Sequence, residues 1–126
     1  MSRINFILSL KSVNDADAVE SFIKELSVPY TSQCEEPNTI SFEWFFDKAE
    51  NRAVILESFV DSEAATLRVK NLMASPVNEP FGQLFDVLEL IVLGEPEDSL
   101  KEILESWSPL YLPYIDGFNK NSSLES

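Results

Sequence analysis

The chain has 126 residues, 44% hydrophobic and 25% charged, which is enough for one folded domain with its own core. A formal charge of −13 opposes binding to nucleic acid and to anionic membrane surfaces, and no apolar run approaches the roughly 20 residues of a membrane-spanning helix. The absence of histidine and the single cysteine, Cys34, argue against a metal site, a haem attachment and an internal disulfide. We therefore expect a cytoplasmic domain without a structural zinc site or an attached haem.

The first third of the chain predicts a strand followed by a helix. Residues 4–10 alternate between apolar and polar side chains, which is typical of a strand with one buried face. Asn14 or Asp15 is expected to cap a helix in which apolar residues recur at i, i+3, i+4 and i+7. Pro29 is expected to end this helix, and a loop should follow it.

The middle of the chain predicts a hairpin and a second helix. Residues 39–46 and 52–59 are rich in aromatic and β-branched side chains and should pair around a five-residue loop. Asp61 or Ser62 is expected to cap the helix that follows. Residues 76–83 contain two prolines and a glycine, which indicates a break in regular structure.

The last third predicts a strand, a helix and an extended segment. Residues 84–93 are almost wholly apolar and indicate a strand buried on both faces. Pro96 suits the first turn of a third helix, and the prolines in residues 108–118 favour an edge strand or an extended arm. Residues 119–126 are polar and expected to be disordered, so that residues 1–118 form a single domain.

The order of these elements predicts an α+β fold. Strand, helix, strand, strand, helix and strand follow one another as in the ferredoxin-like β-α-β-β-α-β antiparallel sheet, and a C-terminal helix and arm are added. Helices should cover one face of this sheet. The other face would then expose more apolar surface than a monomer usually does. We therefore expect a homodimer in which two sheets pack together as a dimeric α+β barrel.

Four segments carry a resemblance to a known family. ISFEWFFD, VILESFVDSEAATLRVKNL, FGQLFDVLELIVLGEPEDSLKEILESW and PLYLPYIDGF, all within residues 40–118, resemble the antibiotic-biosynthesis-monooxygenase-type domains of the dimeric α+β barrel superfamily. The resemblance implies a cavity between each sheet and its own helices. It also implies cofactor-independent, monooxygenase-like activity on a small aromatic compound, of the quinol or polyketide-like kind. Related quinol monooxygenases usually carry a histidine where this chain has Arg68.

Glu57 and Arg68 are the candidate catalytic residues. Glu57 matches the glutamate of the family motif, which implies a role as the base that deprotonates a phenolic substrate, with Arg68 holding the resulting anion. The alternative is a structural ion pair between the two side chains.

Two further glutamates are candidates for the same site. If Phe46 pairs with Arg52 across the hairpin, Glu43 falls on the same face as Glu57, and Glu89 is a candidate to join them from the later strand. Carboxylates crowded in an apolar cleft have raised pKa values. The alternative is that these glutamates lie at a solvated margin of the sheet.

Three aromatic residues are candidates for substrate binding. Phe42 and Trp44 share one face of their strand and could stack on a flat ligand, or could instead anchor a dimer core. Tyr114 lies in the terminal arm and could bind a phenolate or seal a subunit interface. The sequence leaves two functions open: the enzyme described above, or a non-catalytic homodimer that binds a small ligand or a protein partner.

Overall fold

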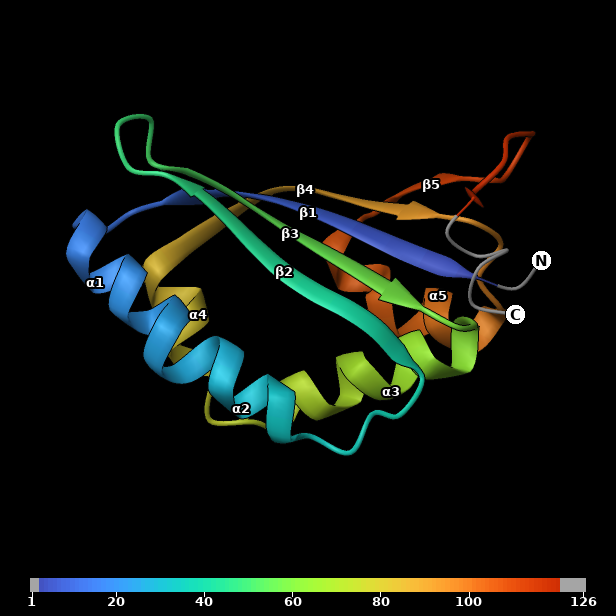
Figure 1. Cartoon of the computed structure of the whole chain (residues 1–126), viewed down its shortest axis with the longest axis horizontal. Helices are drawn as coiled ribbons and strands as arrows, with labels where there is room; N and C mark the ends of the chain where they lie inside the picture. Colours follow the sequence, from blue (N-terminus) through green and yellow to red (C-terminus); the bar gives the residue numbers. More distant parts are fainter. Residues whose placement is uncertain (1–2, 121–126) are drawn as a thin grey trace.

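In residues 3–120, five strands form one sheet, and the helices pack on one side of it (Figure 1). The computed structural model describes residues 3–120, so most of the predicted disordered tail lies outside the described residues. The strands are β1 (Ile4–Ser12), β2 (Thr39–Asp47), β3 (Arg52–Phe59), β4 (Phe85–Leu93) and β5 (Leu110–Leu112). The helices are α1 (Ala16–Phe22), the π-helix η1 (Ile23–Ser27), α2 (Val28–Gln33), α3 (Ser62–Met73), α4 (Asn78–Leu84), α5 (Asp98–Leu104) and the 3-10 helix η2 (Glu105–Trp107).

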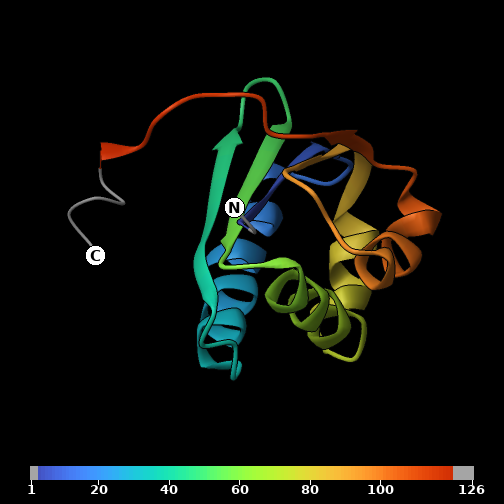
Figure 2. The same ribbon diagram turned by 90° about the vertical axis from the view of Figure 1, so that its right-hand side faces the viewer.

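The strand order confirms the predicted α+β, ferredoxin-like plan. The sheet runs β2-β3-β1-β4-β5, with antiparallel pairing except for β5, which adds to the edge of β4 in the parallel direction. Figure 2 shows the layer of helices on one side of this sheet. Among residues 3–120, no helix is both long enough and apolar enough to cross a bilayer.

The first helical segment is longer than predicted. Asp15 caps α1 as expected, because its carboxylate accepts hydrogen bonds from the backbone N–H groups of Asp17 and Ala18. Pro29 does not end the helical segment, which continues to Gln33. The π-helix η1 precedes it, and Pro29 therefore falls in the first turn of α2, where its missing N–H costs little.

The predicted break at residues 76–83 is mostly helical. The short helix α4 begins at Asn78, with Pro80 in its first turn, where proline fits a helix without losing an intrahelical hydrogen bond. Phe81 of α4 packs against the core. This helix positions one wall of the cavity described below.

The sheet has one buried face and one open face. On β1, the side chains of Ile4, Phe6, Leu8 and Leu10 alternate inward and are buried under the helices. The prediction that β4 is buried on both faces is wrong for the single chain: Leu90 is buried, but Leu88 is 49% exposed, because no helix covers that side.

Candidate functional site

A cavity of about 240 Å³ lies between the inner face of the sheet and the helices. Most of its wall is aromatic or aliphatic. The polar side chains that line it are Ser27, Glu57, Arg68 and Asn78. The apolar side chains that line it are Phe6, Leu8, Phe42, Trp44, Ile55, Val69, Leu72, Val77, Phe81, Phe85, Val87, Leu90 and Trp107. An ionisable group in such surroundings loses most of its hydration.

Strand alternation places Glu57 in this cavity. Ile55, Glu57 and Phe59 occupy successive inward positions of β3, and all three are buried. In the ladder, Glu57 pairs with Phe6 of β1 on one side and with Phe42 of β2 on the other. Its carboxyl group is therefore flanked by positions that carry aromatic rings, and little water reaches it.

Arg68 reaches the same cavity from α3. Its guanidinium lies over the ring of Phe42, 5.4 Å from the centroid. Its Nε atom lies 3.6 Å from Oε1 of Glu57. The predicted proximity of Glu57 and Arg68 is therefore confirmed, although this separation is too long for a normal hydrogen bond.

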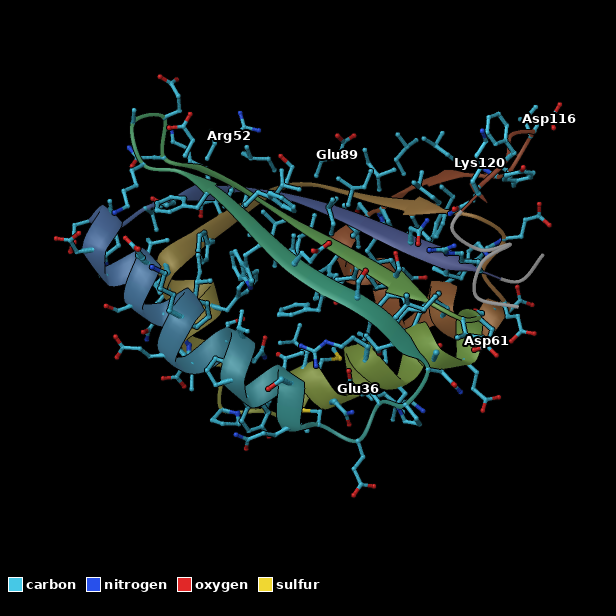
Figure 3. The ribbon with its side chains drawn as sticks, in the orientation of Figure 1. Glu36, Arg52, Asp61, Glu89, Asp116 and Lys120 are labelled. Carbon is cyan, nitrogen blue, oxygen red and sulfur yellow. The ribbon has the colours of Figure 1, made fainter. Side chains whose placement is uncertain are left out.

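The shorter ion pair of Arg68 is with Glu36, which the sequence analysis did not identify. Arg68 Nη1 donates to Glu36 Oε2 over 3.1 Å, and Asn71 Nδ2 donates to the same oxygen over 2.8 Å. Arg68 Nη2 donates to Thr31 Oγ1 over 3.4 Å. Figure 3 places Glu36 on the helix side of the sheet, beside α3, and its side chain is only 4% exposed.

Glu57 has a strongly shifted proton affinity. Burial raises the pKa of Glu57 from its ordinary value of 4.5 to about 7. The positive charge of Arg68 lowers this pKa, and the negative charge of Glu36 raises it. Glu57 therefore exchanges a proton near neutral pH, which is the property that a general base or acid needs.

The predicted cluster of three glutamates does not form. Phe46 pairs with Ala53 rather than with Arg52, so Glu43 pairs with Leu56 and lies on the outer face. Glu89 pairs with Ser9 of β1 and is also exposed, on the opposite side of the sheet from Glu36 (Figure 3). The prediction that these two glutamates share a face with Glu57 is therefore wrong.

The hairpin turn explains this error. Asp47 extends β2 by one residue and pairs with Arg52. Its carboxylate then accepts hydrogen bonds from the backbone N–H groups of Ala49 and Glu50, which closes a turn over residues 48–51. A change of one residue in register exchanges the two faces of a strand.

Phe42 and Trp44 line the cavity and do not lie on the outer face, so they cannot anchor a dimer between outer faces. The indole of Trp44 packs against the rings of Phe22, Phe81 and Phe85, with the nearest centroid, that of Phe85, at 5.3 Å. Its Nε1 donates to Ser27 Oγ over 3.1 Å. This hydrogen bond fixes the ring plane against the π-helix η1.

Tyr114 does not line the cavity of its own chain. It lies after β5, is more than half exposed, and donates its hydroxyl hydrogen to the carbonyl oxygen of Gly117 over 3.0 Å. Among residues 3–120, no group of three or more histidine, cysteine, aspartate or glutamate side chains is arranged to hold a metal ion.

Solved structures resemble this chain, whereas no protein-family model and no curated protein matches its sequence. MupZ from Pseudomonas fluorescens superposes with a TM-score of 0.78 at 18% identity, over 97% of this chain and 93% of MupZ. The chain has the fold of this protein. HapK from Hahella chejuensis matches with a TM-score of 0.59 at 16% identity, over 90% of this chain and 99% of HapK.

A third structure adds a described activity. SnoaB from Streptomyces nogalater, a cofactor-independent oxygenase, matches with a TM-score of 0.59 at 12% identity, over 77% of this chain and 96% of SnoaB. Together with MupZ and HapK, it confirms the fold that the resemblance in sequence implied. At these identities the likeness concerns the fold alone.

Proposed function

We propose that the protein is a cofactor-independent, monooxygenase-like enzyme that acts on a small aromatic compound bound in its cavity. The observation that carries this proposal is the buried carboxyl group of Glu57, which lies in an apolar cavity beside Arg68 and has its pKa raised by burial to about 7. The fold similarity to SnoaB, described as a cofactor-independent oxygenase, supports the same kind of chemistry.

In this reaction Glu57 removes a proton from a ring carbon or hydroxyl group made acidic by conjugation. The negative charge moves from Glu57 to the substrate, and Arg68 lies beside both positions, so it stabilises the anion without reorganisation. The electron-rich ring carbon then adds dioxygen. Loss of the second proton with cleavage of the O–O bond leaves one oxygen atom as a carbonyl group and releases the other as water.

The size of the cavity limits the substrate. An engineered protein cavity of about 150 Å³ binds benzene, so about 240 Å³ accommodates one ring or two fused rings. Phe42 and Trp44 supply flat faces for a ring, and most of the wall offers no hydrogen bonds. The substrate class is therefore a hydroquinone, naphthol or similarly small ring with an acidic proton.

Oxygen consumption tests this function. We expect the protein to accelerate oxygen uptake by one of a panel of hydroquinones, naphthols and anthrones, and Glu57→Gln to reduce that rate about 100-fold or more. Glu43→Gln is the matched control, because Glu43 lies on the outer face, and it should retain the full rate. No uptake above buffer with any compound would contradict the proposal and leave ligand binding without catalysis as the remaining function.

We also propose that the chain forms a homodimer through the outer face of its sheet. Phe45, Leu56, Leu110 and Leu112 are exposed on this face. The segment after β5 leaves the body on the outer side of the sheet (Figure 2), and its Ile115 is 90% exposed. A second copy would remove this apolar surface from water.

A further inference from the structure

We propose that Glu36 is a positioning residue that holds the guanidinium of Arg68 away from Glu57 and so keeps the Glu57 carboxyl group from being locked in an ion pair. This inference rests on the proposed role of Glu57 as the base. Glu36 lies in the segment between α2 and β2 and is not expected to touch the substrate, since it is not among the residues that line the cavity.

The hydrogen bonds of Arg68 point to this role. Its Nη1 and Nη2 atoms are held by Glu36 and Thr31, and only Nε faces Glu57, at 3.6 Å. Glu36 is itself fixed by the amide of Asn71, which donates over 2.8 Å to the oxygen that also accepts from Arg68. The guanidinium is therefore anchored to Glu36 rather than shared equally between the two carboxylates.

Because Glu36 holds Arg68, the positive charge of Arg68 is already balanced and does not fully compensate a charge on Glu57. Arg68 and Glu36 form a buried pair with no net charge, so an ionised Glu57 would be a third, uncompensated charge in the cavity. The neighbouring positions carry no other charge: Phe6 on β1 and Phe42 on β2 flank Glu57 in the ladder. Ser27 of η1 and Asn78 of α4, which line the same cavity, are also uncharged.

Removing the charge of Glu36 should transfer Arg68 to Glu57. In Glu36→Gln the side chain keeps its size and can still accept from Asn71, and Glu57 is the carboxylate that remains beside Arg68 within residues 3–120. A carboxylate next to an unshared guanidinium has a pKa lowered by about one unit or more. The matched control is Glu35→Gln, which removes the same charge from the adjacent, exposed position.

The experiment is a titration of the Glu57 carboxyl carbon by NMR in protein labelled with carbon-13 at glutamate, with the signal assigned by its loss in Glu57→Gln. We expect the pKa of Glu57 to fall by about one unit or more in Glu36→Gln and to stay unchanged in Glu35→Gln. A Glu57 pKa that is unchanged or raised in Glu36→Gln would overturn the proposal, as would an equal fall in both variants.

A second variant covers the case in which Glu36→Gln does not fold. Glu36→Asp keeps the charge but withdraws it by one methylene group, so the pKa of Glu57 should be lower than in the parent protein. An unchanged or higher value in a folded Glu36→Asp would overturn the proposal. The titration needs no substrate, so it separates this inference from the oxygenase activity: the pKa can fall as expected even if no compound consumes oxygen.

Discussion

Glu57 and Glu43 lie on adjacent strands, one ladder position apart, yet they belong to different environments. Glu57 faces the helices, is buried, and has its pKa raised by that burial to about 7. Glu43 faces the other way and is exposed. The comparison shows that the helix layer, rather than the acidic composition of the chain, creates a carboxyl group suited to proton transfer.

The apolar residues of the two faces differ in the same way. Under the helices, Leu8 and Ile55 are buried around the cavity. On the outer face, the large apolar side chain of Phe45 in β2 is 52% exposed. One face is thus completed within the chain, and the other is proposed to need a second copy. Substitutions on either face test this contrast.

Arg68→Leu should have the largest effect on the inner face. It would leave the carboxylate of Glu36 buried without its cation, which typically destabilises a protein by about 3–5 kcal/mol. Urea unfolding at neutral pH measures this loss. Lys70→Leu, at an exposed position of the same helix, is the control and should change the stability little. A loss below about 1 kcal/mol in Arg68→Leu would show that the pair is not held as described.

Glu57→Gln should change how stability depends on pH. The pKa of Glu57 in the folded state, about 7, lies above the ordinary value of 4.5, so the folded state favours the protonated carboxyl group. The stability that this preference contributes is fully present below about pH 4.5 and is lost as the pH rises through 7. Glu57→Gln should therefore gain about 3 kcal/mol relative to the parent between about pH 4.5 and pH 8.

Urea unfolding of both proteins at the two pH values measures this gain. Glu43→Gln should keep the pH dependence of the parent, since it leaves Glu57 in place. A constant difference between Glu57→Gln and the parent at both pH values would contradict the raised pKa.

Phe45→Asp tests the outer face. A carboxylate placed in an apolar interface should weaken self-association by about 2 kcal/mol or more, roughly 30-fold. Analytical ultracentrifugation should show the parent at twice the chain mass of 14.3 kDa and the variant shifted toward a single chain. Met73→Asp adds the same charge on an exposed position of the helix layer and should remain dimeric. A monomeric parent would exclude the proposed dimer.

Trp44→Phe should have the smallest effect. It removes the hydrogen bond from Trp44 Nε1 to Ser27 Oγ, which contributes about 1 kcal/mol. A double-mutant cycle with Ser27→Ala isolates this term, and the coupling energy should also be about 1 kcal/mol. Additive effects of the two substitutions would show that the hydrogen bond contributes nothing to stability.

Features set by local pattern could be predicted from the sequence. Alternation on residues 4–10 predicted the buried face of β1, and Asp61 caps α3, since its carboxylate accepts from the N–H of Ala64. The phase of Glu57 along β3 and its proximity to Arg68 were also correct. These predictions depend only on neighbours close in the chain or on a strand's period of two.

Features set by small backbone shifts or distant contacts could not be predicted. Strand β2 continues to Asp47, one residue beyond the predicted end, and Asp47 pairs with Arg52. In this register Glu43 lies on the outer face. The π-helix η1 let the helical segment continue past Pro29. Glu36 reaches Arg68 from 32 residues away, and its neighbours in sequence resemble those of an ordinary loop. No periodic pattern marks such a contact.

The pKa of Glu57 in the unmodified protein, measured by the carbon-13 titration of its carboxyl group, tests directly whether this side chain can exchange a proton. We expect a value of about 7, because the helices bury this side chain and its nearby cation, Arg68, is held by Glu36. A value at or below 4.5 would contradict this expectation, since Glu57 would then be an ordinary ionised partner of Arg68 with no proton to exchange near neutral pH.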